Sequence, residues 1–120
     1  MASTAYHESL DLLTEDTRNM HRAIVSLTEE MEAIDWYQQR VDACSDPQLK
    51  AVLLHNKNEE IEHASMVMEW IRRHSDHFNE MMRKYLFTEP PITAIEKSAE
   101  TESPAAAGAE TLGIGNMKGR

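Results

Sequence analysis

The chain has 120 residues, 41% of them apolar and 28% charged, and its 12 basic and 21 acidic residues give a net charge of −9. This size and composition predict a single folded domain, and the acidity disfavours nucleic acid as a partner because phosphate backbones are also negative. All four glycines lie after residue 107, which excludes the glycine-rich loops that cradle phosphates. There is no apolar run of membrane-spanning length, no visible secretory signal and only one cysteine, Cys44. We therefore expect a soluble, cytoplasmic protein with no membrane association.

Residues 7–43 are predicted to form one long helix, because they contain neither proline nor glycine and their apolar residues recur at helical spacing. These apolar residues are Leu10, Leu13, Met20, Ile24, Leu27, Met31, Ile34 and Val41. Asp46 and Pro47 are typical of an N-cap and of the first position of a new helix, so the first helix is expected to end just before them. A short turn between two long helices predicts an antiparallel hairpin.

The second helix is predicted over residues 47–74, after which Ser75-Asp76 forms a further capping pair. A shorter amphipathic helix is expected to follow and to end at Glu89-Pro90-Pro91. Residues 97–111 lack every large apolar side chain and are predicted to be a flexible linker. The predicted organisation is therefore a helical domain over residues 1–96, a linker over 97–111 and a tail over 112–120.

The predicted fold class is all-α, an antiparallel two-helix hairpin followed by a short C-terminal helix. Two long helices cannot bury an apolar stripe by themselves, so such a hairpin is expected to be half of a four-helix bundle. The other half is expected to come from a second copy through two-fold symmetry, which makes a homodimer the smallest stable unit. Trp70 and the methionines are assigned to the core, and Trp36 is assigned to interface packing.

Three polar residues, Asn56, Glu60 and His63, interrupt the apolar face of the second helix. A charged group on such a face costs several kcal/mol unless it is paired or binds a metal. The Glu60-x-x-His63 spacing puts both side chains on one helix face, one turn apart. Di-iron carboxylate bundles use this unit on two helices and a single glutamate on each of the other two.

The first helix is therefore expected to offer a glutamate level with Glu60. If the turn centres near Ser45, the level position is residue 30, which is a glutamate; each of the two lies about 22 Å of helix from the turn. One chain then supplies half of the ligands of a two-metal site. Glu-x-x-His also occurs by chance on solvated helix faces, and only its combination with Glu30 favours metal binding.

Several segments resemble the encapsulated ferritins: residues 29–37 (EEMEAIDWY), 55–56 (HN), 59–64 (EEIEHA) and 85–96 (YLFTEPPITAIE). Residues 112–115 (LGIG) resemble the peptide that loads cargo into encapsulin shells. The resemblance covers nearly the whole chain. It implies a ferritin-like fold and a ferroxidase that oxidises Fe(II) with O₂ at a di-iron centre between two chains, built from Glu30, Glu60 and His63 of each. It also implies a ring-shaped homodecamer of five dimers, housed inside an encapsulin nanocompartment that it enters through residues 112–120 and in which the iron is stored as mineral.

Further acidic residues lie at the same level of the two helices. Glu29 and Glu32 are interpreted, with the help of the resemblance, as secondary metal sites on an approach route for cations, whereas Asp35, Glu59 and Glu62 are interpreted as an ordinary solvated face. Tyr37 lies two turns after Glu30 on the same face, where it is a candidate hydrogen-bond donor or electron source for the metals.

Two other functions remain open at the level of the sequence. The same di-iron site is compatible with a peroxidase or oxidative-stress protein, because the ligands alone do not determine the oxidant. A non-enzymatic helical dimerisation module is the third hypothesis, with Glu60 and His63 forming an ion pair instead of a metal site.

Overall fold

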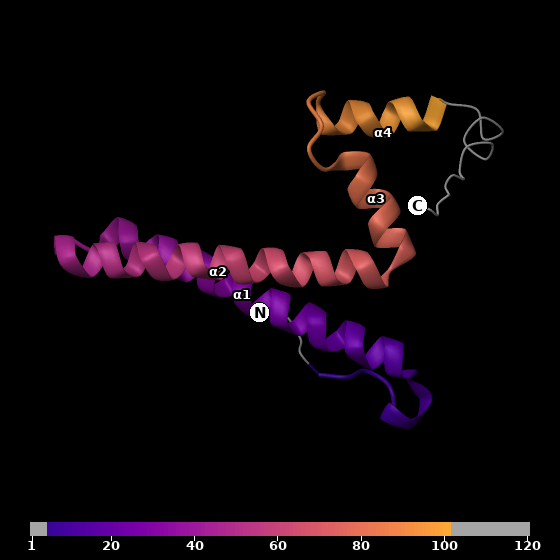
Figure 1. Cartoon of the computed structure of the whole chain (residues 1–120), viewed down its shortest axis with the longest axis horizontal. Coiled ribbons are helices and arrows are strands. Elements are labelled where there is room, and N and C mark those ends of the chain that lie inside the picture. The colour runs from indigo at the N-terminus through magenta and orange to yellow at the C-terminus, as the bar shows by residue number, and fades with distance from the viewer. Residues whose placement is uncertain (1–4, 102–120) are drawn as a thin grey trace. The chain divides into compact units, whose positions relative to one another are not determined.

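The computed structural model describes residues 5–101, and every regular element within them is a helix (Figure 1). The elements are a short 3₁₀ turn η1 (Leu10–Leu12) and the helices α1 (Glu15–Ala43), α2 (Pro47–His74), α3 (Asp76–Tyr85) and α4 (Ile92–Thr101). The predicted all-α class is confirmed. None of these helices is long and apolar enough to cross a membrane. The chain divides into two compact units, one ending at Asn79 and one beginning at Glu80.

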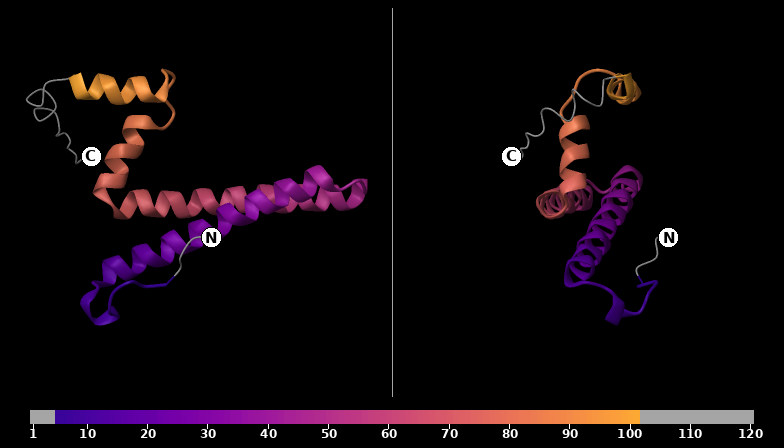
Figure 2. Two further views of the ribbon diagram at one scale, coloured as in Figure 1. Left: turned by 180° about the vertical axis from the view of Figure 1, so that it is seen from behind. Right: turned by 90° about the vertical axis from the view of Figure 1, so that its right-hand side faces the viewer.

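The first unit is built on the antiparallel hairpin of α1 and α2, which contact each other and are closest near their turn (Figures 1 and 2). The Asp46 carboxylate accepts a hydrogen bond from the Leu49 backbone N–H at 2.8 Å, and Pro47 occupies the first turn of α2. This cap satisfies a backbone donor that has no partner within the helix. The predicted bounds of the second helix, residues 47–74, are confirmed.

The first helix begins eight residues later than the sequence pattern predicts, at Glu15 instead of residue 7. The Thr14 hydroxyl accepts a hydrogen bond from the Thr17 N–H at 3.1 Å and caps the helix. The Arg18 guanidinium donates to the carbonyls of Leu10 and Leu13, at 3.0 and 3.1 Å, and so fixes the preceding turn. Helical spacing of leucines before Thr14 is therefore misleading, because a good N-cap and an arginine that binds the preceding carbonyls favour a separate turn.

The hairpin buries little apolar surface on its own. Among the described residues only Val41, Ala64 and Ile71 are buried. Large apolar side chains are exposed along both helices: Ile24, Met31 and Trp36 on α1, and Leu49, Val52, Leu54, Ile61, Met66 and Met68 on α2. Apolar surface on this scale is typical of a protein face that is covered by another chain.

Helix α3 is capped as predicted, with the Ser75 hydroxyl accepting from the Phe78 N–H at 3.2 Å. After α3, Phe87 adopts a left-handed backbone conformation with φ 62°, and Pro91 accepts backbone hydrogen bonds from the start of α4. Helix α4 continues through residues 97–101, which corrects the first part of the predicted flexible linker. Lys, Ala and Glu are good helix formers, so the lack of large apolar residues there did not prevent a helix. The rest of the predicted linker and the predicted tail lie outside the described residues.

Candidate metal centre

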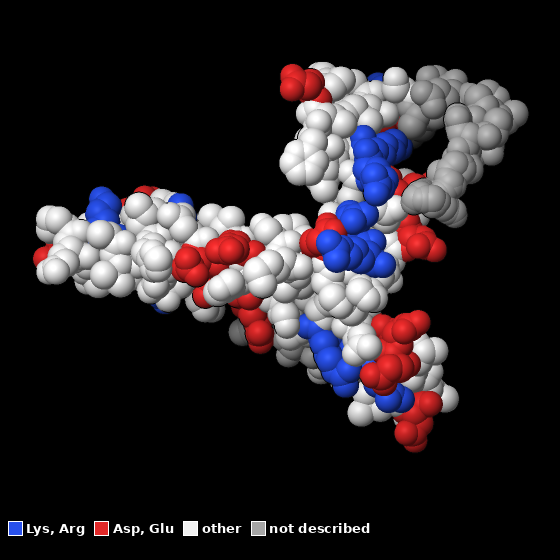
Figure 3. Space-filling view, in the orientation of Figure 1, with Lys and Arg blue, Asp and Glu red and all other residues white. Residues whose placement is uncertain are grey.

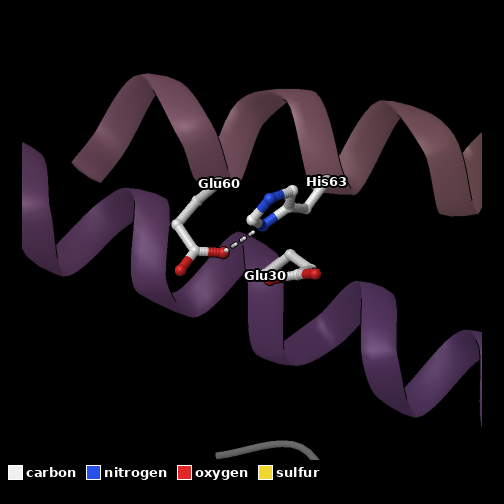
Figure 4. Close-up of side chains that lie close together, drawn as sticks. All are labelled: Glu30, Glu60 and His63. Carbon is white, nitrogen blue, oxygen red and sulfur yellow. Dashed lines mark ion pairs between the residues drawn. The ribbon is translucent and has the colours of Figure 1, made fainter. Parts of the chain in front are cut away.

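Glu30 of α1 and Glu60 and His63 of α2 meet at the middle of the hairpin (Figure 4). One potential ligand atom from each of the three side chains lies within 4.8 Å of the others. Glu60 and His63 come together because they are one turn apart on one helix, whereas Glu30 reaches them only through the register of the hairpin. The structure thus brings together the three side chains that the sequence places at one level.

The contacts inside this cluster leave one carboxylate oxygen unsatisfied. His63 Nδ1 lies 3.5 Å from Glu60 Oε1, and His63 Nε2 lies 4.0 Å from Oε1 of Glu59. Glu60 Oε1 is buried and accepts no hydrogen bond, because the His63 contact at 3.5 Å is an ion-pair distance without hydrogen-bond geometry; the Glu60 side chain as a whole is 25% exposed. A buried carboxylate oxygen without a donor is costly, and a bound cation removes that cost.

The carboxyl group of Glu30 adds a second acidic group beside Glu60. A hydrogen bond to Glu60, partial burial and repulsion from the Glu60 charge together raise the pKa of Glu30 above its usual value, and the nearby His63 only partly opposes this. Two neighbouring carboxylates can be satisfied by a shared proton or by a cation between them. Carboxylate oxygens with one imidazole nitrogen are a ligand set suited to iron and similar divalent metals.

The cluster borders an open groove of about 490 Å³ between the two helices. Helices α1 and α2 are close together near the hairpin turn and diverge toward the beginning of α1 (Figures 1 and 2). Besides Glu30 and His63, the groove is lined by Asn19, Arg22, Ala23, Ser26, Met66, Val67 and Trp70. The centre is therefore open along one side of the hairpin, and a second chain can approach it there.

The other predicted site residues lie outside the three-residue cluster. Glu29 is exposed and Glu32 is half-buried, and the Glu29 charge contributes to the raised pKa of Glu30. Tyr37 is half-buried, and the Arg40 guanidinium lies over its ring at 5.3 Å from the centroid. Acidic side chains gather over the middle of the hairpin (Figure 3). That distribution agrees with a negative field around the cluster.

Sequence reasoning missed two features of the site. Glu59, interpreted as part of a solvated face, is within ion-pair distance of His63. Met66 lines the groove and is 63% exposed in the single chain; its assignment to the core of a two-chain bundle stays a prediction.

A helical hairpin with a carboxylate–histidine cluster at its centre is similar to one half of a four-helix bundle, and comparison with known proteins identifies the family. Residues 5–89 match the EncFtn-like family. The chain is 52% identical to the encapsulated ferritin-like protein of Rhodospirillum rubrum, with 98% of this chain and 91% of that protein covered. The chain belongs to the EncFtn-like family.

Two further relatives agree with this assignment. A ferritin-like protein of Thermotoga maritima is 45% identical, over 91% of this chain and 94% of that protein. The crystal structure of protein NE0167 from Nitrosomonas europaea superposes with a TM-score of 0.70 at 55% sequence identity, covering 72% of this chain and 96% of that chain. At 28% identity over 83% of this chain and 84% of the relative, the encapsulin nanocompartment cargo protein EncC of Myxococcus xanthus is a more distant relative.

The raised pKa of Glu30 predicts a stability effect of defined sign. An acid whose pKa is raised in the folded state binds protons more tightly there, so its penalty on folding is present above the raised pKa and absent below the usual value of 4.5. In metal-free protein, Glu30→Gln is expected to increase the free energy of unfolding at pH 7 and to leave it unchanged below pH about 4. Urea denaturation with a chelator present measures the free energy of unfolding of the two proteins at each pH.

Bound divalent metal should make the parent protein more stable than Glu30→Gln, the reverse of the order expected without metal. Saturation with Co²⁺, which is not oxidised by air under these conditions, is expected to stabilise the parent protein more than Glu30→Gln, because only the parent retains the carboxylate ligand. Glu62→Gln is the matched control, an exposed glutamate on α2 outside the cluster. Equal stabilisation of all three proteins by Co²⁺ would show that Glu30 is not a ligand.

Proposed function

We propose that this protein is a ferroxidase that oxidises Fe²⁺ with O₂ at a centre shared by two copies of the chain. The observation that carries the proposal is the convergence of Glu30, Glu60 and His63 within 4.8 Å, with a buried Glu60 oxygen that no donor satisfies. Fe²⁺ is here the substrate. Hard carboxylate oxygens bind it, and they stabilise the ferric product still better because its charge is higher.

The need for two copies follows from the number of ligands and from the exposed surface. One chain offers two carboxylates and one imidazole, whereas a pair of metal ions in a helical bundle uses four carboxylates and two imidazoles. A second hairpin related by two-fold symmetry would supply the missing half and cover apolar side chains that are exposed on the single chain, such as Val52 and Met66. The proposed unit is a four-helix bundle formed by a homodimer, and five such dimers form the proposed ring.

The chemistry requires the two half-sites to act together. Each Fe²⁺ gives up one electron, so two of them are needed to reduce O₂ by two electrons and, with two protons, to hydrogen peroxide. Glu30 and Glu60 hold the ions close together and balance the charge that builds up on oxidation. Glu29 and Glu32 are proposed as weaker cation sites on the approach to the centre, and Tyr37 as a nearby donor of a hydrogen bond or an electron.

Storage of the product is proposed to take place in an encapsulin nanocompartment. The names of two relatives describe an encapsulated ferritin-like protein and an encapsulin nanocompartment cargo protein. An open site on a helical hairpin offers no enclosed space for mineral, so a separate container is needed. Residues 112–120 are proposed to be the segment that binds the shell, with residues before them as a tether.

Loss of a ligand is expected to abolish rapid iron oxidation. Glu60→Ala, His63→Ala and Glu30→Ala should each lower the initial rate of Fe²⁺ oxidation by at least about tenfold, which is what even the supporting residues of metal sites commonly contribute. Helix content by circular dichroism should not change, because the substitutions remove polar groups and keep good helix formers. The rate is measured by ferric absorbance, together with the O₂ consumed per iron.

The matched control for this series is Glu62→Ala, which removes an exposed carboxylate from the same turn of α2 and should retain the parent rate. Normal oxidation by both Glu60→Ala and His63→Ala would refute the site. Consumption of added peroxide in preference to O₂ would instead support the peroxidase hypothesis at the same site.

Metal binding and assembly should be linked. Four glutamates gathered between two chains repel one another until cations neutralise them, so a dimer that shares the centre gains stability from bound metal. Chelated protein is expected to sediment as smaller species in analytical ultracentrifugation and to shift to larger ones when Fe²⁺ is added without O₂. In Glu60→Ala this shift should be lost. Sedimentation that is indifferent to metal and chelator would argue against a shared centre.

Residues 112–120 are expected to direct packaging into the shell independently of iron oxidation. An apolar segment with glycines between its side chains suits an extended peptide that inserts alternate residues into pockets of a partner. Deletion of residues 112–120 should leave iron oxidation in solution unchanged but should prevent co-purification with a co-expressed encapsulin shell. Residues 97–120 fused to an unrelated soluble protein should carry it into the shell. Failure of that transfer, with the full-length protein packaged in parallel, would disprove the assignment.

A further inference from the structure

The imidazole of His63 lies between two carboxylates of its own helix. Glu60 Oε1 is 3.5 Å from His63 Nδ1, and Glu59 Oε1 is 4.0 Å from His63 Nε2. Glu60 precedes His63 by three residues and Glu59 precedes it by four, and both spacings make side chains neighbours on a helix surface. All three residues belong to α2, so a second copy of the chain is not needed to form these contacts.

The two nitrogens of His63 have different surroundings. Nδ1 faces Glu60, which belongs to the candidate metal cluster. Nε2 faces Glu59, which is outside that cluster. A neutral imidazole carries its proton on one nitrogen and a lone pair on the other, and only the lone pair can bind a metal ion. A metal ion bound by Nδ1, beside Glu60, therefore requires the proton to be on Nε2, the nitrogen that faces Glu59.

The carboxylate of Glu59 is suited to accept a hydrogen bond from that N–H. Within residues 5–101, His63 is the one side chain with which Glu59 forms an ion pair. The 4.0 Å separation exceeds a hydrogen bond, but rotation about the side-chain bonds of Glu59 can close the gap without backbone movement. A cation on Nδ1 withdraws electrons from the ring and strengthens Nε2–H as a donor, so metal binding and the contact with Glu59 favour each other.

We propose that Glu59 is a positioning residue for His63, an inference that rests on the proposed ferroxidase centre. Its carboxylate accepts a hydrogen bond from His63 Nε2–H and so keeps the lone pair on Nδ1. The same bond fixes the orientation of the ring toward Glu60 and makes the imidazole a stronger electron donor to a metal ion. Without Glu59, the ring is free to turn, and either nitrogen can carry the proton.

A general effect of negative charge is the alternative explanation that the test has to separate. Glu62 provides the comparison, because it is an exposed glutamate next to His63 that forms no ion pair with it. Removal of Glu59 or of Glu62 lowers the negative charge around the centre by the same amount. Attraction of cations by charge alone therefore predicts similar losses of metal affinity, whereas a hydrogen bond to His63 predicts a loss only for Glu59.

The test measures the Co²⁺ affinity of the full-length protein by isothermal titration calorimetry, together with the visible absorption spectrum of bound Co²⁺. Glu59→Ala should lower the affinity by about tenfold or more and should change the spectrum, because the imidazole ligand is no longer held in place. Glu62→Ala should lower the affinity by less than about twofold, since an exposed charge contributes little. Similar losses in the two variants would overturn the inference.

A conservative variant separates the hydrogen bond from the charge. Glu59→Gln has no charge but keeps a side-chain oxygen that accepts a hydrogen bond. It should recover most of the affinity that Glu59→Ala loses and should restore the parent spectrum of bound Co²⁺. An affinity and a spectrum no closer to the parent than those of Glu59→Ala would overturn the inference.

A double-variant cycle tests whether Glu59 acts through His63. If it does, adding Glu59→Ala to His63→Ala should cause no further loss of Co²⁺ affinity, because the residue that Glu59 positions is already absent. A further loss as large as that in the parent protein would show that Glu59 acts independently of His63, and it would overturn the positioning role.

The same titrations distinguish the inference from the function on which it rests. Weaker Co²⁺ binding by His63→Ala, with Glu59→Ala unchanged from the parent, would overturn the inference and leave the proposed centre standing. Equal Co²⁺ binding by the parent and His63→Ala would overturn both, because His63 would then not be a ligand. Circular dichroism of each variant checks that its helices are intact.

Discussion

The proximity of two carboxyl groups, Glu30 and Glu60, is the constraint on which the rest of this structure depends. Their hydrogen bond, partial burial and mutual repulsion raise the pKa of Glu30, and one Glu60 oxygen is buried without a donor. Water cannot fully solvate such a pair, and His63 at 3.5 Å compensates only one of the two. A shared proton, or the proposed metal ion, would place positive charge between the two carboxyl groups and so lower the cost of their proximity.

The shape of the hairpin explains why this unfavourable pair is accessible. Because α1 and α2 diverge away from their turn (Figure 2), the space beside the carboxylates is a groove instead of a packed core. Only three of the described side chains are buried, so a single chain has little apolar burial with which to offset the cost of the carboxylates. In the proposed dimer, a second copy would add apolar burial and bring a second set of ligands at the same surface.

Local signals in the sequence predicted the parts of the fold that depend on caps and register. Asp46-Pro47 located the start of α2, and counting from the turn placed Glu30 beside Glu60, because a rigid helix converts residue number directly into height. The same reasoning failed where tertiary contacts decide the outcome. The carbonyls before Thr14 bind Arg18, eight residues from the first of them, and periodicity cannot reveal such a contact.

The number of ligands on one chain bears on how many electrons the proposed centre could give to O₂. A single hairpin presents three ligands and, at most, one metal ion, which can give O₂ only one electron; one-electron reduction would release superoxide. Two-electron reduction needs a second ion held nearby, and the proposed dimer is what holds it. In the proposed function, assembly therefore does more than add apolar burial: it would place a second Fe²⁺ beside the first, so that O₂ could be reduced by two electrons at one centre.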